Sequence, residues 1–214
     1  MSRFTILLGG DLVPTPLLAA QIERTRVIAA DGGMRHAAML GLMPELWVGD
    51  FDSVPEGLPE PYSSIQRETF PAEKDATDGE LAIGAALSRG ANSLVIAGAF
   101  GGPRADHAFL HMALALHLAE NGTNVLLTSG KQEGYPLPTG SSQFDYEDGT
   151  LFSILAFSDL VGLTVSGAKW PLHNVDVPFG SSLTISNESR GRLCITLERG
   201  RALLLAHPFP DPKD

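Results

Sequence analysis

The sequence has almost no cysteine, few basic side chains and no long apolar run. Its single cysteine, Cys194, excludes a disulfide within the chain and fits a reducing compartment. Lysine and arginine total 15 against 25 acidic residues, which gives a formal charge of -10. Because nucleic acids and anionic membranes are bound through basic surfaces, we expect neither as a partner.

Targeting and membrane signals are also missing from the sequence. The start, "MSRFTILLGGD", has too short an apolar stretch for a signal peptide, and no run reaches the length of a membrane span. A soluble cytoplasmic protein is therefore the expectation. Hydrophobic residues make up 43% of the 214 positions, which is enough for a real core in one domain or two small ones.

Strand-like and helix-like segments alternate through the first 130 or so residues. Strands are expected at 3–10, 26–33, 45–53, 93–102 and 124–129, and helices at 15–25, 34–42, 77–90 and 106–122. Thr77, with Glu80 three residues later, is typical of a capping box at a helix start. The alternation predicts an α/β domain over 1–130, with three layers and a mostly parallel sheet covered on both faces.

The character of the sequence changes after this region. Residues 131–149 are rich in Gly, Pro and Ser and predict a connection. Short strand-like segments follow, namely "LFSILAFS", "VGLTVSG", "SSLTISN", "RLCITLE" and "RALLLAH". In "RLCITLE" the apolar Leu193, Ile195 and Leu197 alternate on one face. Residues 150–214 therefore predict a small all-β domain, either a sandwich or a barrel.

Acidic residues gather where the expected strands end. Asp31 follows the second strand, Asp50 and Asp52 follow the third in "WVGDFDSVPE", and Asp75 and Asp78 lie at the start of helix 77–90. Each has an ordinary alternative, since Asp78 suits a helix dipole and Asp50 with Asp52 suits a solvated turn. Ligands of open α/β sheets bind beyond the carboxyl ends of the strands. Five acids meeting there would repel one another unless a hard cation such as Mg²⁺ lies among them.

Groups suited to phosphate lie at the same expected edge. Arg104 and Lys74 are placed to meet phosphate oxygens. Glycines that allow close approach of backbone N–H groups accompany them, namely Gly9, Gly10, Gly33, Gly101 and Gly102. His107 alone is more typical of a helix start than of a catalyst. Neither G-x-x-x-x-G-K-[ST] nor a G-x-G-x-x-G after the first strand is present, so a phosphate site must be of another kind.

Taken together, these segments resemble the thiamine pyrophosphokinase family. "ADGG", "VGDFDS", "KDATDGE" and "GAFGGPRADH" occur in that family's order and spacing. "GLTVSGAKWPL" and "TISNES" resemble stretches of its second half, so the resemblance covers about residues 5–205. One departure is Pro103, which is inserted before Arg104 in the family's usual G-G-R-x-D-H.

The resemblance implies the reaction ATP + thiamine → thiamine diphosphate + AMP, with Mg²⁺ as cofactor and ATP as co-substrate. It implies that Mg²⁺ is held by Asp50, Asp52 and Asp78, with Asp31 and Asp75 as further candidates. Arg104 is expected to steady the moving phosphates, with Lys74 as a weaker candidate and His107 in support. Asp106 either orients Arg104 or acts as the base for the thiamine hydroxyl, and both roles stay open.

The second domain is then expected to bind thiamine. An aromatic face suits a flat cation, which makes Trp170 the candidate, with Ser186 and Asn187 as hydrogen-bonding partners. Without the resemblance, Trp170 would be interpreted as a core residue of the β domain. The family's pocket lies between two subunits, so the resemblance also implies a homodimer.

Three other functions compete with this interpretation. "DFDSV" fits the D-x-D-x-[TV] of haloacid-dehalogenase-type phosphatases, although there the motif follows the first strand and here the third. A D-x-D sugar-nucleotide transferase is a second rival. A non-catalytic nucleotide or thiamine sensor is a third, and the intact acids in every motif argue against it.

Overall fold

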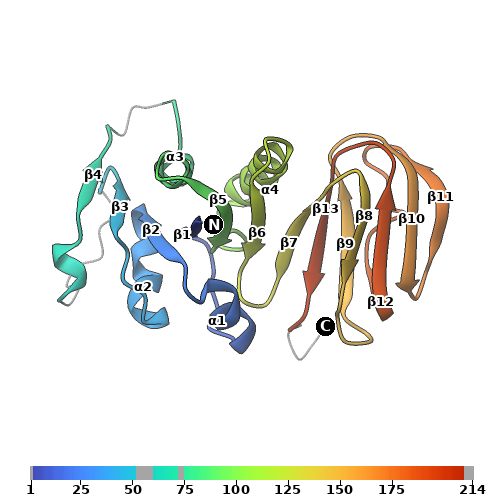
Figure 1. Ribbon diagram of the computed structural model, residues 1–214, viewed down its shortest axis with the longest axis horizontal. Coiled ribbons are helices and arrows are strands. Elements are labelled where there is room, and N and C mark those ends of the chain that lie inside the picture. Colours follow the sequence, from blue (N-terminus) through green and yellow to red (C-terminus); the bar gives the residue numbers. More distant parts are fainter. Residues whose placement is uncertain (1, 52–59, 72–74, 210–214) are drawn as a thin grey trace. The chain divides into compact units, whose positions relative to one another are not determined.

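A computed structural model describes residues 2–51, 60–71 and 75–209 of the chain. The chain divides into two compact units, residues 1–108 with 122–130 and residues 109–121 with 131–214. Figure 1 labels the elements along the chain.

The first unit is an α/β domain. Its elements are β1 (Ser2–Leu7), α1 (Pro16–Ile22), β2 (Arg26–Ala30), η1 (Asp31–Met34), α2 (Arg35–Leu40), β3 (Leu46–Gly49), η2 (Tyr62–Ser64), β4 (Arg67–Thr69), α3 (Asp78–Ser88), β5 (Ala91–Ala97), the start of α4 (Ala105–Glu120) and β6 (Asn124–Thr128). The strands lie in the order β6-β5-β1-β2-β3-β4, and every neighbouring pair is parallel. In Figure 1, α3 covers one face of this sheet and α1 and α2 cover the other.

Local sequence signals account for the ends of these helices. Thr15 caps α1 by accepting a hydrogen bond from the Leu18 N–H, and a proline opens the first turn. Helix α2 ends at Gly41, whose φ of 63° is left-handed and suits glycine. The predicted capping box of α3 is confirmed, with Thr77 and Glu80 each bonding the other's backbone N–H.

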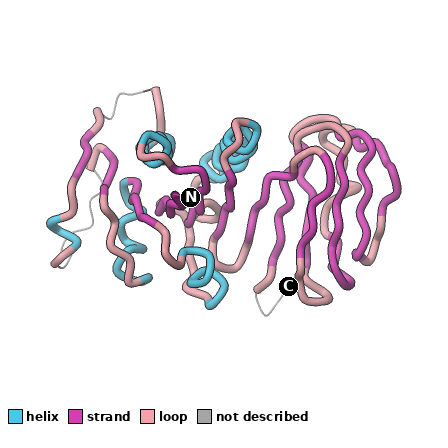
Figure 2. Tube along the Cα trace, in the orientation of Figure 1, coloured by secondary structure: helices cyan, strands magenta, loops and turns pink. Residues whose placement is uncertain are grey.

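The second unit is an all-β domain apart from its share of α4. Its strands are β7 (Glu133–Leu137), β8 (Gly140–Phe144), β9 (Leu151–Ala156), β10 (Leu160–Ala168), β11 (Leu172–Val177), β12 (Asn187–Leu197) and β13 (Ala202–His207). All their pairings are antiparallel. The first residues of β12 pair with β9 beside β13 and β7, and the rest of β12 pairs with β8 and β10, so β12 takes part in two sheets. Figure 2 shows these strands in magenta.

A hydrophobic core lies between the strands of the second unit. Leu193, Ile195 and Leu197 of β12 are all buried there, as their alternation predicts, together with Phe152 and Leu204. The predicted fold class, an α/β domain followed by a small all-β domain, is confirmed.

Some secondary-structure elements differ from those expected from the sequence. Residues 131–149 contain β7 and β8 and are not only a loop. The expected strand at 181–187 is instead a series of turns up to Asn187. Gly180 and Ser186 there have left-handed φ values of 83° and 60°, which interrupt an extended strand. The short strands β4 and β11 were not predicted.

Candidate active site

Two acidic residues lie at the carboxyl ends of neighbouring strands in the first unit. Asp31 directly follows β2 and Asp50 directly follows β3. A Cβ added at Gly49 would lie 3.3 Å from the Asp31 Cα, so the two strand ends approach closely. The Trp47 indole N–H also donates to the Asp31 carbonyl oxygen at 2.9 Å. The turns that carry Asp31 and Asp50 therefore start side by side at this edge of the sheet.

The donors at this edge fit a magnesium ion. Within residues 2–51, 60–71 and 75–209, no group of at least three His, Cys, Asp or Glu side chains could hold a metal by itself. Mg²⁺ in proteins is usually bound by one or two carboxylates together with substrate phosphates, and carboxylate oxygens are the ligands it prefers. Asp31 and Asp50 supply such oxygens from adjacent turns. Asp52 lies outside the described residues.

Helix α3 brings its own acid toward the same strands. The helix packs on β2 and β3, and Asp78 is its first residue and half-buried. Asp75 precedes the helix and is exposed, while Lys74 lies outside the described residues. Asp78 also suits the positive end of the helix dipole, as expected from the sequence.

The glycine-rich turns after β1 and β5 are packed against each other. A Cβ at Gly10 would lie 2.3 Å from the Gly98 carbonyl oxygen, and a Cβ at Gly33 would lie 2.1 Å from that of Leu7. Any side chain at position 10 or 33 would collide with these backbone atoms, so the packing alone requires glycine at both positions. A Cβ at Gly9 or Gly102 would meet nothing nearer than 3.9 Å. A side chain would therefore have room at these last two positions.

Three residues that the sequence analysis missed shape the turn after β1. The Asp11 carboxylate accepts a hydrogen bond from the Gly102 N–H at 2.8 Å. Arg35 donates to the Gly9 and Gly10 carbonyl oxygens, and His36 Nε2 donates to that of Gly10 at 2.9 Å. His36 is buried, and this burial lowers its pKa. The signal available in the sequence was the polar "GGD" after the first strand and the "RH" after "DGGM".

Arg104 and Asp106 form an ion pair at the start of α4. Arg104 Nε lies 2.9 Å from Asp106 Oδ1, and Nη2 lies 2.7 Å from Oδ2. Both side chains are exposed, at 61% and 64%. The hydrogen bond from Arg104 holds the pKa of Asp106 well below its usual range. The Arg104 carbonyl oxygen accepts from the N–H groups of His107 and Ala108, so Arg104 lies directly before the first residue of α4.

The three residues expected to bind thiamine lie together in the second unit. The Asn187 side chain accepts from the Trp170 N–H and donates to the Trp170 carbonyl oxygen at 3.1 and 2.8 Å. Ser186, the residue before Asn187, is held by a hydrogen bond from its N–H to Ser153 Oγ. Trp170 is 54% exposed and is therefore not a core residue of this chain. Lys169 Nζ lies 4.5 Å from its ring centroid.

Comparison with known proteins decides the family. Residues 20–127 match the thiamin pyrophosphokinase catalytic domain, and residues 142–201 match the vitamin B1 binding domain of thiamin pyrophosphokinase. The chain belongs to the thiamine pyrophosphokinase family. Members of this family are transferases that form thiamine diphosphate.

Similar thiamine pyrophosphokinases cover nearly the whole chain. The thiamine pyrophosphokinase of Bacillus subtilis (strain 168) is 32% identical over 203 residues, which span 89% of this chain and 92% of that protein. A crystal structure of the B. subtilis enzyme superposes with a TM-score of 0.83 at 26% identity, covering 96% of this chain and 99% of the other. The Candida albicans enzyme has a TM-score of 0.80 at 15% identity, covering 96% and 89%, and supports the fold alone.

Membership in the thiamine pyrophosphokinase family favours the first interpretation over its rivals. The structure places Asp50 directly after β3 and not after β1, unlike the motif of the phosphatase rival. Among the helices of the described residues, none has the length and apolar character needed to cross a membrane.

Proposed function

We propose that this chain carries out the reaction of its family, in which the pyrophosphoryl group of ATP moves to the hydroxyl of thiamine and AMP is released. The observation that carries this proposal is the meeting of Asp31 and Asp50 at adjacent strand ends, in a chain whose two halves both match the family. The reaction needs alignment and charge neutralisation more than covalent help from the protein.

The first unit is proposed to bind ATP and magnesium. Asp31 and Asp50 would hold the ion from the strand ends. The family resemblance assigns Asp52 and Asp78 to it together with Asp50, and gives Asp75, like Asp31, as a further candidate. Mg²⁺ bound there would neutralise charge on the phosphate oxygens of ATP. The open space beside Gly9 supports contact of its backbone with phosphate, since a side chain there would block the approach of an anion. The space beside Gly102 is open as well, but its N–H already donates to Asp11 Oδ2.

Basic groups complete the proposed phosphate site. Arg104 stands at the end of the glycine-rich turn after β5 and donates to the moving phosphates, assisted by Lys74. Asp106 already holds one edge of the guanidinium. Its lowered pKa makes it a weak base, which supports an orienting role over proton abstraction. Gly101 and His107 shape the turn and the helix start around Arg104.

The second unit is proposed to bind thiamine. The exposed Trp170 offers an indole ring to a flat cation. Lys169 Nζ lies over this ring at 4.5 Å from its centroid and is paired with Glu188 at 2.6 Å. The side chains of Ser186 and Asn187 supply polar partners for the pyrimidine part of thiamine. The proposed division of labour is residues 1–130 for ATP, 131–149 as connection and 150–214 for thiamine.

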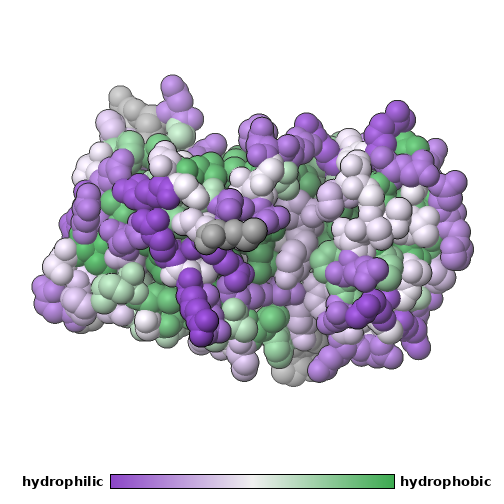
Figure 3. Space-filling view, in the orientation of Figure 1, coloured by the Kyte–Doolittle hydropathy of each residue, from purple (hydrophilic) through white to green (hydrophobic). Residues whose placement is uncertain are grey.

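A homodimer and a cytoplasmic location complete the proposal. The second unit exposes apolar side chains at Trp170, Phe179, Leu183 and Ile185, between 43% and 67% accessible, which a second subunit would cover. On the face shown in Figure 3, hydrophilic side chains alternate with smaller hydrophobic areas. The lone Cys194 fits a reducing cytoplasm. Light scattering of the purified chain measures its oligomeric state.

One incubation tests the reaction. Purified protein is mixed with ATP, thiamine and Mg²⁺, and the nucleotides and thiamine esters are separated. AMP and thiamine diphosphate in equal amounts are expected. ADP as the primary product would mean transfer of a single phosphoryl group and would contradict the proposal.

A further inference from the structure

The turn that carries Asp50 rests on a small aromatic cluster. The Trp47 ring is fully buried and meets the Phe51 ring edge-to-face, with centroids 5.0 Å apart and planes at 89°. This geometry is a favourable one for two aromatic rings. Trp47 therefore touches the turn after β3 through its ring and the turn after β2 through its N–H bond to Asp31.

Arg67 lies over both rings of this cluster. Its guanidinium carbon is 4.7 Å from the Trp47 ring centroid and 5.4 Å from that of Phe51. Arg67 faces Trp47 directly in the parallel pairing of β3 with β4. Two backbone hydrogen bonds flank this pair, one from the Trp47 backbone N–H to the Gln66 carbonyl oxygen and one from the Phe70 backbone N–H to the Gly49 carbonyl oxygen. The short strand β4 thus holds the guanidinium in place.

Phe51 depends on such support. Its φ is 63°, a left-handed conformation that bulky residues seldom adopt and that persists only where the surroundings impose it. Phe51 follows Asp50 and precedes Asp52 in the chain. The conformation of Phe51 consequently sets the direction in which the backbone leaves Asp50.

We infer that Arg67 is a positioning residue, which holds the acidic turn of Asp50 in its metal-binding form by stacking on Trp47 and Phe51. This inference rests on the proposed function, because it assumes that Asp50 is a metal ligand. Arg67 acts through the aromatic rings of Trp47 and Phe51. A planar guanidinium can stack over two rings, whereas the compact ammonium of lysine cannot cover both.

Metal binding to the chain tests the inference without turnover. In a Trp170→Phe background Trp47 is the remaining tryptophan, since the chain has two, so its fluorescence reports on the turn. Mn²⁺ is titrated alone and with α,β-methylene-ATP, and quenching gives its half-saturation. Arg67→Ala should raise the half-saturation about tenfold, which is the loss of one cation–π contact of about 1.4 kcal/mol. The Mn²⁺ half-saturation of Arg67→Lys should lie closer to that of Arg67→Ala than to that of wild type.

A matched control comes from the amino-terminal end of strand β2 in the same sheet. Arg26 stacks on Phe4 at 4.3 Å and starts strand β2, away from the acidic turns. Arg26→Ala removes the same kind of contact, together with an ion pair to Glu45 at 2.7 Å, and should leave the Mn²⁺ half-saturation within about twofold of wild type, because neither contact touches an acidic turn. In kinetics, Arg67→Ala should shift the Mg²⁺ requirement while the thiamine KM stays unchanged. A general loss of structure would change both the Mg²⁺ requirement and the thiamine KM.

The outcomes separate the inference from the proposed function. Wild-type quenching by Mn²⁺ that Asp50→Asn abolishes supports the metal site. If Arg67→Ala and Arg67→Lys then bind Mn²⁺ as wild type does, the positioning role is overturned and the metal site stands. If Asp50→Asn also binds Mn²⁺ normally, the metal assignment itself is overturned. Should Arg67→Ala fail to fold by circular dichroism, Arg67→Lys alone decides.

Discussion

Arg104 holds the carboxylate of Asp106 at two points, with Nε 2.9 Å from Oδ1 and Nη2 2.7 Å from Oδ2. A guanidinium carries five N–H donors in one plane. The pair with Asp106 engages one edge of that plane and fixes its direction. The opposite edge is then oriented in advance for phosphate oxygens, which lowers the entropic cost of alignment in the transition state.

Replacing Arg104 should therefore lower the rate and not only the affinity. We expect Arg104→Ala to reduce kcat roughly 100-fold, the usual effect of losing one preorganised donor to developing charge. Arg104→Lys should recover little, because an ammonium cannot make two parallel hydrogen bonds. Arg201→Ala is the control, since Arg201 makes a similar exposed two-point pair with Glu120 in the second unit. Full kcat in Arg104→Lys would contradict the assignment.

The lowered pKa of Asp106 gives a second prediction, about pH. Its carboxyl group is held ionised by Arg104 well below the ordinary value of about 3.9, so it carries no proton anywhere in the working range. Asp106→Asn should then lower kcat while leaving the acidic limb of the kcat–pH profile at the same pH. Steady-state rates between about pH 5 and 9 measure this. If the kcat–pH profile of Asp106→Asn lacked the acidic limb, Asp106 would be identified as the base.

The acidic turns give a third prediction. Asp50→Asn removes a proposed magnesium ligand and should lower kcat about 100-fold or more at saturating Mg²⁺, since charge neutralisation by a bound metal is worth several kcal/mol. Asp145→Asn is the control, because it only removes an exposed ion pair with Arg192 in the β domain. Circular dichroism should be unchanged in both. An Asp50→Asn enzyme with normal kcat would exclude this residue as a ligand.

Much of this arrangement was readable in the sequence, because its signals are local. The strand-end acids Asp31 and Asp50 follow apolar runs directly, and the capping box of Thr77 lies within one helical turn. Parallel strands carry their carboxyl ends to one edge, so the meeting of the two acidic turns follows from topology alone. Burial on both faces of such a sheet also makes its strands easy to identify.

The parts that were missed depend on contacts far apart in sequence. Strand β4 has three exposed residues, and only its pairing with β3 makes it a strand. Arg67 therefore gave no local signal of its stacking on Trp47. Asp11 likewise reaches Gly102 across 91 positions of the chain. Strands β7 and β8 lie in a stretch whose glycine and proline content hides them, and antiparallel partners from β13 and β12 stabilise them.

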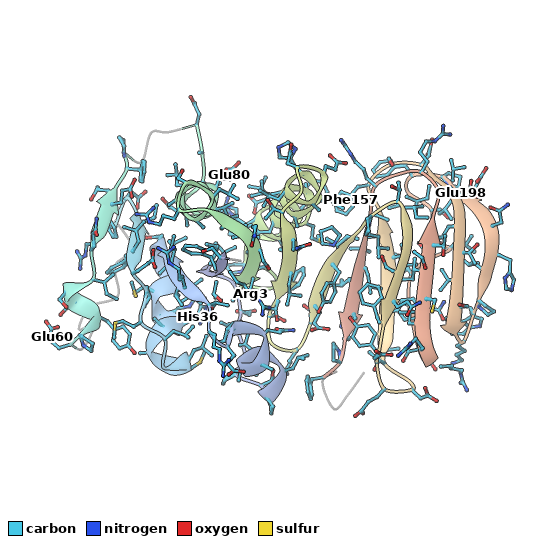
Figure 4. All side chains as sticks on the ribbon, viewed as in Figure 1. Arg3, His36, Glu60, Glu80, Phe157 and Glu198 are labelled. Carbon is cyan, nitrogen blue, oxygen red and sulfur yellow. The ribbon has the colours of Figure 1, made fainter. Side chains whose placement is uncertain are left out.

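His36 gives a fourth prediction, on stability. Burial disfavours the charged imidazolium by more than the hydrogen bond from Nε2 to the Gly10 carbonyl oxygen favours it, so the pKa of His36 lies below that of the unfolded chain. Figure 4 labels His36, on helix α2. The unfolded chain therefore binds this proton more readily. The stability that neutral His36 contributes is present above about pH 6.5 and is lost as the pH falls through the lowered pKa.

His36→Gln keeps a donor for Gly10 but cannot be protonated. The difference in Tm between wild type and this variant should shrink as the pH is lowered from about 8 to 5, because only wild type loses stability by protonation there. His173→Gln serves as the control, since His173 is exposed on β11. A Tm difference that stays constant with pH would show that His36 is not the group responsible.

Trp170 gives the last prediction, on the thiamine site. A cation over an indole face is worth roughly 0.5–2 kcal/mol, and loss of ring contact adds to this. Trp170→Ala should therefore raise the KM for thiamine about tenfold, since 1.4 kcal/mol is one decade, and leave the KM for ATP nearly unchanged. Because the side chain is 54% exposed, the Tm should hardly move, whereas loss of a core tryptophan costs roughly 3–5 kcal/mol.

The matched variant for this site is Trp170→Phe, which keeps an aromatic face of smaller size. Its thiamine KM should lie between those of wild type and Trp170→Ala, because phenylalanine attracts a cation less strongly than tryptophan does. Both kinetic constants and the Tm are measured for each variant. A large fall in Tm with an unchanged thiamine KM in Trp170→Ala would mean that the ring only stabilises the β domain. In that case the thiamine site would have to be sought away from Asn187, whose amide is bonded to the Trp170 backbone.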